Sequence, residues 1–157
     1  MRTLALVVAG FGGQGILSAG RIVTEAGMLQ GLEVSWLPSY GPEMRGGTAN
    51  CHVVLSDTPI GSPILNGCDA LIAMNGPSFE RFEPMVRPGG LVIVDGSLLC
   101  PSSTRPDIRL LSLPASSVAA EMGNRTFASV ILLGCLSAAT GAFDRTSFEA
   151  ALRVVLP

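Results

Sequence analysis

The chain has 157 residues, of which 48% are hydrophobic and only 14% are charged, and it is long enough for one domain over residues 1–157. So little charge leaves few side chains to cover a free surface, and we therefore expect a buried interface with a partner. The net charge of −2 argues against nucleic-acid binding, and the absence of lysine excludes a P-loop or Schiff-base lysine.

The first half of the chain begins with a continuous apolar run, Thr3 to Ala9, which predicts a strand buried on both faces. A glycine-rich turn follows, and then a helix to about Gln30 that Gly31 ends as a C-terminal cap. A second strand over Val34 to Leu37 completes a βαβ unit. Further extended segments are expected at Thr48 to Ser56 and at Ala70 to Met74.

The second half continues the alternation of strands and helices. Strands are expected at Leu91 to Asp95 and Arg109 to Leu113, a turn at Arg87 to Gly90, and helices near Ser78 to Met85, Ala115 to Met122, Phe127 to Thr140 and Thr146 to Val155. Gly141 closes the third of these helices, and Thr146 with Glu149 forms a capping box at the start of the last one. This alternation predicts an α/β fold, a three-layer Rossmann-like sheet that is mostly parallel with helices on both faces. The chain ends directly after a helix, which leaves a natural end and a missing short C-terminal tail as alternatives.

The turn after the first strand carries the spacing of a dinucleotide fingerprint, Gly10-x-Gly12-x-x-Gly15, between a strand and a helix. Its glycines let the backbone approach a diphosphate, which the N–H groups at the start of the helix attract. We therefore assign ligand binding to the residues of this turn, Gly10, Gly12, Gly13, Gln14 and Gly15. The alternative is that the glycines only permit close packing of helix and strand.

An NAD-binding site of this type needs an acidic residue about 20 positions on, at the far end of the second strand. Here Glu33 falls at the start of that strand. The position of this acid argues against an ordinary NAD-dependent dehydrogenase.

A Gly- and Pro-rich loop, Pro38 to Gly47, follows the carboxyl end of the second strand, where open α/β sheets bind their ligands. Its polar side chains Ser39, Tyr40, Glu43 and Arg45 are candidate ligand contacts, and the Arg45 guanidinium suits a phosphate or a carboxylate. The alternative is an ion pair between Glu43 and Arg45 that holds the loop or docks it onto a partner.

Four other polar residues stand in or after the predicted strands. Asn75 follows the fourth strand at its carboxyl end and is assigned to the ligand site. Asp95 can face a ligand or cap a turn, while His52 is read as a hydrogen-bonded sheet residue. Cys51 is read as buried, because no second histidine is available to activate it. We assign no catalytic residue.

The four cysteines are Cys51, Cys68, Cys100 and Cys135, and no C-x-x-C motif brings two of them together. We therefore expect neither an iron–sulfur cluster nor any other metal site on this chain. Scattered cysteines, no visible signal peptide and no apolar run of about 20 residues together predict a cytoplasmic protein without a membrane span.

Two motifs together resemble the gamma subunits of 2-oxoacid:ferredoxin oxidoreductases. These are Gly-Phe-Gly-Gly-Gln-Gly at residues 10–15 and Ser-Tyr-Gly-Pro-Glu-Met-Arg-Gly-Gly at residues 39–47. The resemblance continues through Ile72 to Asn75 and Gly89 to Asp95 into the late helices. The string from Trp36 to Cys51 looks most like the 2-oxoglutarate or branched-chain branch rather than the pyruvate branch.

The resemblance implies a complex that oxidatively decarboxylates a 2-oxoacid, with 2-oxoglutarate favoured, passes electrons to ferredoxin and releases an acyl-coenzyme A. It implies alpha and beta subunits as partners, with a ferredoxin-like delta subunit as a further candidate. Thiamine diphosphate and iron–sulfur clusters are expected on those partners. This chain is expected to handle coenzyme A and to assist assembly, without catalytic activity alone. The alternative is a free-standing nucleotide-binding module that senses a ligand or regulates a partner.

Overall fold

In the computed structural model, which describes residues 3–39 and 48–157, the described strands form a six-stranded sheet in the order β2-β3-β1-β4-β5-β6. The strands are β1 (Thr3–Phe11), β2 (Glu33–Ser39), β3 (Thr48–Ser56), β4 (Cys68–Ala73), β5 (Val86–Asp95) and β6 (Arg109–Leu113). The helices are α1 (Ile16–Leu29), α2 (Gly76–Phe82), the 3-10 turn η2 (Glu83–Met85), α3 (Ala115–Glu121), α4 (Phe127–Thr140) and α5 (Arg145–Val155).

Five of these six strands run in one direction. The pairs β1–β4, β4–β5 and β5–β6 are parallel, whereas β3 is antiparallel to both β1 and β2. The mostly parallel sheet predicted from the sequence is therefore confirmed. The strands of the predicted βαβ unit, β1 and β2, do run parallel, but β3 lies between them, which the local sequence does not indicate.

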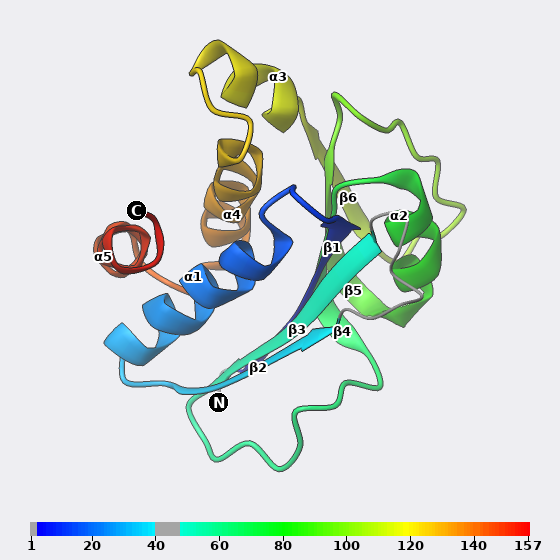
Figure 1. Ribbon diagram of the computed structural model, residues 1–157. Helices are drawn as coiled ribbons and strands as arrows, with labels where there is room; N and C mark the ends of the chain where they lie inside the picture. Colours follow the sequence, from blue (N-terminus) through cyan, green and yellow to red (C-terminus); the bar gives the residue numbers. More distant parts are fainter. Residues whose placement is uncertain (1–2, 40–47) are drawn as a thin grey trace.

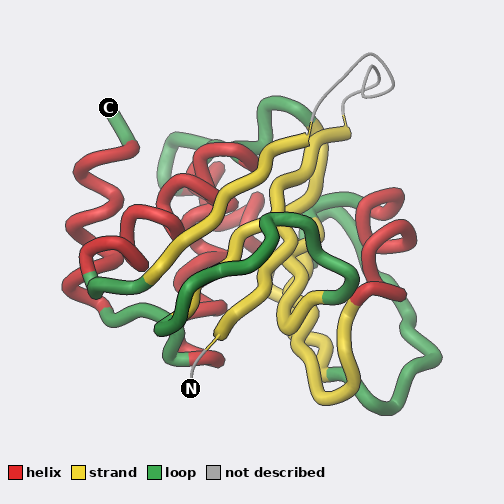
Figure 2. The backbone as a smooth tube through the Cα atoms, turned by 90° about the horizontal axis from the view of Figure 1, so that it is seen from below, coloured by secondary structure: helices red, strands yellow, loops and turns green. Residues whose placement is uncertain are grey.

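Helices cover both faces of the sheet (Figure 1), so the predicted three layers are confirmed. On one face α1, α3, α4 and α5 pack over the larger hydrophobic cluster, which includes Leu6, Val8, Ile22, Ile72 and Leu132. On the other face α2 covers a smaller cluster, which includes Val7, Leu71, Phe79, Phe82 and Val92. Figure 2 shows the sheet between the larger and the smaller group of helices. Alternate residues of β1 enter the two clusters, as a strand buried on both faces requires.

Two helix ends match the sequence prediction. The residue after the α1 C-cap is Gly31, at φ +78°, and the N–H groups of Gly31 and Leu32 donate to the carbonyls of Met28 and Gly27 at 2.9 and 3.0 Å. This is the paired hydrogen-bond pattern of a glycine-terminated helix. Helix α4 has the predicted bounds and ends at Gly141, which is also left-handed.

Two predicted boundaries are wrong. The expected turn at Arg87 to Gly90 is a bulge inside β5, where these four residues lie opposite the single residue Asp69 of β4. The N-cap of α5 is Asp144 rather than Thr146, because the Asp144 carboxylate accepts the Ser147 N–H at 2.7 Å. Glu149 pairs with Arg145 instead of forming a capping box.

Candidate functional site

The glycine turn lies at the carboxyl edge of the sheet, between the end of β1 and the start of α1. Gly13 and Gly15 have φ angles of +87° and +78°, a conformation that favours glycine. Gly10 is still part of β1, and a Cβ there would lie 2.6 Å from Gln14 Oε1 and 3.0 Å from Met74 Cβ. The glycines therefore meet both conformational and packing needs, so the packing alternative raised by the sequence is partly correct.

The Gln14 side chain fastens this turn to its neighbours. Its Oε1 accepts the Phe11 N–H at 2.6 Å, and its Nε2 donates to the Met74 carbonyl at 3.3 Å. Gln14 was predicted as a ligand contact, but both ends of its amide are used inside the protein. A ligand at this turn could meet the backbone N–H groups and the second N–H of Gln14 Nε2, for which no described residue is an acceptor.

The first turn of α1 is open to an anion. Its N-cap is Gly15, which offers no side chain to the first N–H groups, and the first turn contains no acidic residue. The first N–H groups of this 14-residue helix have no partner within the helix, and they carry a partial positive charge.

Two clefts flank the glycine turn, and Gly13 lines both. The apolar cleft, of about 590 Å³, lies between the turn, α1 and α4 and is lined mainly by Phe11, Ile16, Leu17, Val130, Leu156 and Pro157. The serine–arginine cleft, of about 450 Å³, lies on the other side of the turn and is lined by Gln14, Met74, Ser97, Ser116, Ser117 and Arg125 among others. Both volumes fall in the range typical of small-molecule sites.

The far wall of the serine–arginine cleft is held by Asp95, a fully buried residue at the carboxyl end of β5. Its carboxylate accepts the N–H groups of Ser97 at 3.1 Å and Ser116 at 3.2 Å, and also the Ser116 hydroxyl. Of the two roles considered from the sequence, Asp95 fulfils the capping role. Ser97, Ser117 and Arg125 were not singled out from the sequence, although Ser97 and Ser117 follow shortly after parallel strands, where ligand sites occur.

Asn75 lies at the same edge and caps α2. Its Oδ1 accepts the Ser78 N–H at 2.8 Å, while its buried Nδ2 has no hydrogen-bond partner in the described structure. Asn75 therefore has a structural role as the N-cap of α2, which was not expected when the sequence assigned it to the ligand site.

The remaining predicted contacts lie in or beside the loop after β2. Ser39 is the last residue of β2 and is paired with Asn50 of β3. Tyr40, Glu43 and Arg45 lie outside the described residues. Their assignment to the site stays a prediction.

His52 and Cys51 lie on opposite faces of β3. His52 is a sheet residue of β3 as expected, but the expectation that its hydrogen bonds are satisfied is wrong, because its buried Nδ1 has no partner in the described residues. Its ring packs edge-on against Phe82, with 6.2 Å between the ring centroids. Burial, and secondly the charge of Arg81, lower the pKa of His52. Cys51 is buried as predicted, and burial raises the pKa of its thiol to about 12. Such a thiol is a poor nucleophile.

Two features are absent from residues 3–39 and 48–157. None of the helices there is both long and apolar enough to cross a membrane. In the same ranges no group of three or more His, Cys, Asp or Glu side chains is placed to hold a metal ion.

Almost the entire chain matches one protein family. The family model described as pyruvate ferredoxin/flavodoxin oxidoreductase matches residues 5–157. The chain is 40% identical over 154 residues to the ketoisovalerate oxidoreductase subunit VorA of Methanothermobacter marburgensis, covering 97% of this chain and 32% of that protein. It is 32% identical over 153 residues to the 2-oxoglutarate synthase subunit KorC of Methanocaldococcus jannaschii, covering 96% of this chain and 82% of that protein. The chain thus spans about a third of the length of VorA and most of the length of KorC.

Solved structures share the fold. The gamma subunit of keto/oxoacid ferredoxin oxidoreductase from Geobacter sulfurreducens has a TM-score of 0.89 and 26% identity, covering 100% of this chain and 87% of that chain. The 2-oxoglutarate:ferredoxin oxidoreductase from Magnetococcus marinus, with 2-oxoglutarate, coenzyme A and succinyl-CoA bound, has a TM-score of 0.87 and 27% identity, covering 97% of this chain and 27% of that chain. The chain therefore belongs to the pyruvate ferredoxin/flavodoxin oxidoreductase family and has the fold of a 2-oxoacid:ferredoxin oxidoreductase gamma subunit.

Proposed function

We propose that this chain works within a complex that converts a 2-oxoacid, coenzyme A and oxidised ferredoxin into an acyl-coenzyme A, carbon dioxide and reduced ferredoxin. Two electrons leave the substrate in this reaction, and each of two ferredoxins takes one. The partners are alpha and beta subunits, with a ferredoxin-like delta subunit as a further candidate. A cytoplasmic location belongs to the same proposal, and it agrees with four free cysteines.

The role we assign to this chain is to hold part of coenzyme A. The observation that carries it is the glycine turn at the carboxyl edge of the sheet, where the N-cap Gly15 and the first residues of α1 line the apolar cleft. Coenzyme A contains a diphosphate, and helix N-termini of this kind bind such groups. The solved relative with coenzyme A bound adds support, because it has the same fold over nearly all of this chain.

We place thiamine diphosphate and the iron–sulfur clusters on the partner subunits. Thiamine diphosphate would supply the carbanion chemistry of decarboxylation, and the clusters would carry the electrons. In residues 3–39 and 48–157 no three or more His, Cys, Asp or Glu side chains are grouped to hold a metal ion, which supports placing the clusters on the partners. The chain itself would bind and orient the acyl acceptor, without a general base or nucleophile of its own.

The substrate we propose is a 2-oxoacid of the 2-oxoglutarate or branched-chain type. The sequence motifs favour these over pyruvate, with 2-oxoglutarate first. Identity is nevertheless higher to the ketoisovalerate oxidoreductase subunit, at 40%, than to the 2-oxoglutarate synthase subunit, at 32%. Both acids therefore belong in the assay.

The test is to purify the tagged chain from its own cells, identify the chains that come with it, and assay dye reduction by each 2-oxoacid with and without coenzyme A. Recovery of thiamine-binding and cluster-binding chains, with activity that requires coenzyme A, is the expected result. A chain recovered alone and inactive would overturn the proposal. A free-standing nucleotide-binding module would then be the better description.

A further inference from the structure

We propose that the free side of β6, together with a partly exposed stripe of α4, is the surface on which an extended segment of a partner subunit adds a strand to the sheet. The segment that fits is mostly apolar and carries one carboxylate side chain. This inference rests on the proposed function, because it names the surface that joins this chain to the complex. It involves neither the glycine turn nor the two clefts beside it.

The outer strand β6 leaves backbone groups open along its length. It pairs with β5 and has no neighbour on its other side among the described strands. The Leu113 carbonyl accepts the N–H of Gly96, the residue after β5, at 2.7 Å, so the backbone groups of Leu113 point toward β5. Because this direction alternates along a strand, the N–H and C=O groups of Leu110 and Ser112 point away from the sheet. These are the groups that a further strand would bind.

The two outer strands of the sheet differ in how they are protected against such pairing. Strand β2 begins with Glu33 and contains Pro38, which has no N–H to give to a neighbouring strand. Charges and prolines of this kind keep outer strands from pairing with other chains. Strand β6 has no proline and no acid, its only charge is Arg109 at the first position, and Leu110 is 37% exposed. An apolar outer strand without these protections is suited to pairing with a strand of another chain.

Helix α4 supplies apolar surface beside this strand. None of its 14 residues is charged, and one side of it is buried in the larger hydrophobic cluster. Ile131, Cys135 and Ala138 share another side, because they are spaced by four and three residues, and none of the three is fully buried. This α4 stripe lies next to β6, since the charge of Arg109 opposes the rise that burial causes in the pKa of Cys135. A helix that is apolar on all sides is normally covered on all sides, so the stripe needs a cover.

The charge of Arg109 decides which chain covers this surface. Arg109 is exposed and makes no ion pair with any described residue. A second copy joined through β6 would bring another arginine but no carboxylate, because β6 and α4 contain no acid. A segment of a different subunit with Asp or Glu opposite Arg109 supplies the missing charge, and its apolar side chains can pack on the α4 stripe. Charge complementarity therefore favours a partner subunit over a second copy.

The first test is amide hydrogen exchange in the unaltered, purified complex, measured residue by residue. We expect the N–H groups of Leu110 and Ser112 to exchange as slowly as that of Leu111, which points toward β5, and about 100-fold or more slowly than unprotected amides. Leu111 is the internal control, because its protection does not depend on a partner. Exchange of Leu110 and Ser112 at the rate of unprotected amides would overturn the inference, whatever any variant does.

The second test measures how much alpha and beta subunit is recovered with tagged variants of this chain. Arg109→Glu and Leu110→Lys should each lower recovery about tenfold or more, and Arg109→Gln should lower it less. The matched control is Arg153→Glu, which makes the same change of charge at an exposed arginine of α5 and should have no effect. Thermal unfolding identifies a variant that does not fold, and the exchange result then decides. Full recovery with both Arg109→Glu and Leu110→Lys would overturn the inference.

The third test identifies the chain that covers β6. A photocrosslinker is attached to the thiol of Leu110→Cys in a Cys100→Ser background, which removes the exposed cysteine, and the complex is illuminated. We expect a crosslink to one segment of another subunit that contains Asp or Glu. A crosslink between two copies of this chain would overturn the choice of partner. If the unaltered chain recovers no other subunit, the proposed function fails and this inference with it, whereas recovery of the subunits with an unprotected β6 refutes this inference alone.

Discussion

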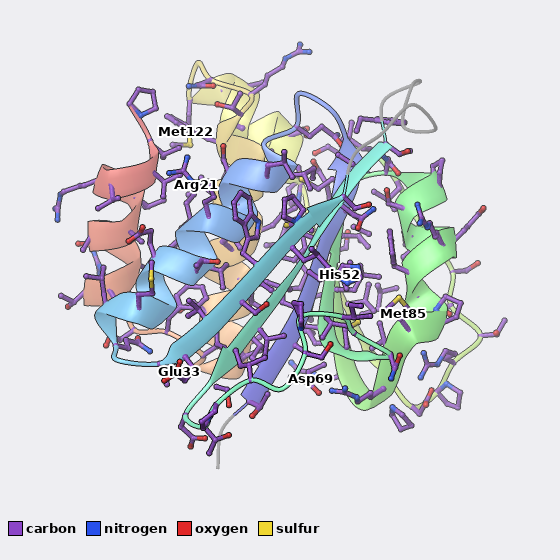
Figure 3. The ribbon with its side chains drawn as sticks, turned by 60° about the horizontal axis from the view of Figure 1, so that its bottom comes forward. Arg21, Glu33, His52, Asp69, Met85 and Met122 are labelled. Carbon is purple, nitrogen blue, oxygen red and sulfur yellow. The ribbon has the colours of Figure 1, made fainter. Side chains whose placement is uncertain are left out.

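The two edges of the sheet differ in the ion pairs that their arginines form. At the amino-terminal edge, where Asp69 lies (Figure 3), two arginines form ion pairs with aspartates. Arg87 binds Asp69 at 2.9 Å, and Arg105 binds Asp107 at 2.9 Å. Asp69 also accepts the Ala5 N–H at 2.8 Å, which ties β1 to the bulge between β4 and β5. At the carboxyl edge the N-cap of α1 offers no side-chain acceptor to the first N–H groups of the helix, and Arg125 has no ion-pair partner among the described residues.

We infer from this difference that the ion pairs of the amino-terminal edge serve stability and that the open groups of the carboxyl edge serve ligand binding. Contacts satisfied within the protein stabilise the fold but have no donors left for a ligand. Groups left open at the carboxyl edge contribute little to the fold and remain available for an anion. Substitutions at the two edges should therefore change different measured quantities.

The largest expected effect compares two glycines at opposite ends of α1. Gly13 and Gly31 both have positive φ, at +87° and +78°, and an added Cβ would meet nothing within 4 Å at either position. Alanine at either position should cost roughly 1 kcal/mol of stability because the backbone is strained. Only Gly13→Ala, which adds a methyl group in the turn, should raise the KM for coenzyme A, by about tenfold or more. Equal KM values for coenzyme A in the two variants would contradict the idea that ligand binding depends on the carboxyl edge.

Asp69→Ala should have the largest effect on stability at the amino-terminal edge. It leaves the Ala5 N–H without its acceptor, which costs about 1–3 kcal/mol. The melting temperature should fall by about 2–4 °C for each kcal/mol, as measured by thermal unfolding of the variant. Arg87→Gln, which removes only the exposed ion pair, is the matched control and should have a smaller effect. A raised KM for coenzyme A in Asp69→Ala would contradict this distinction, because a change at the amino-terminal edge would then affect ligand binding.

The buried thiols of Cys51 and Cys68 should make the free energy of unfolding fall at high pH, by less than the substitutions above. Burial raises the pKa of Cys51 and Cys68 from 9.0 to about 12, so these thiols stay protonated in the folded protein while the unfolded chain ionises. Their contribution to stability is full below pH 9 and is lost as the pH rises from about 9 to 12. Thiol labelling at pH 8 should modify the exposed Cys100 quickly and Cys51 only after unfolding. Rapid labelling of Cys51 in the native protein would refute its burial.

The smallest expected effect concerns His52 on the α2 face of the sheet (Figure 3). Its pKa is lowered first by burial and then by Arg81, so its contribution to stability is present at neutral pH and is lost as the pH falls through the lowered pKa. Because His52 is the only histidine, one NMR titration reports it directly. Arg81→Gln should raise this pKa without returning it to the ordinary value, since burial remains. A midpoint at or above 6.5 in the unaltered protein would contradict this account.

Local patterns predicted much of the fold. The bounds of α4 and β6 were predicted correctly, because a glycine ends α4 and an apolar run marks β6. The insertion of β3 between β1 and β2 could not be predicted, since strand order depends on pairing between distant residues. The β5 bulge was missed because Arg-Pro-Gly-Gly has the composition of a turn.

The candidate site was only partly predictable. The glycine turn follows from a contiguous motif with known backbone requirements. The wall of the serine–arginine cleft could not be predicted from such a motif. Asp95 and Ser116, which form it, are 21 residues apart in the sequence and meet only in the folded protein. The internal roles of Gln14 and Asn75 were also hidden, since a sequence shows that a side chain is polar but not which group it binds.

The central place of β1 also has a consequence for synthesis on the ribosome. β1 is made before the other five strands of this sheet, and its partners come much later, with Thr3 opposite Ser56 in β3 and Leu6 opposite Ala70 in β4. The apolar β1 therefore has no partner strand until β3 has left the exit tunnel, and its second neighbour is missing until β4 has followed. Such delayed, long-range pairing slows folding and favours aggregation of nascent chains. Slowing translation after β4 should consequently do less harm to the yield of folded subunit than slowing it between β1 and β3.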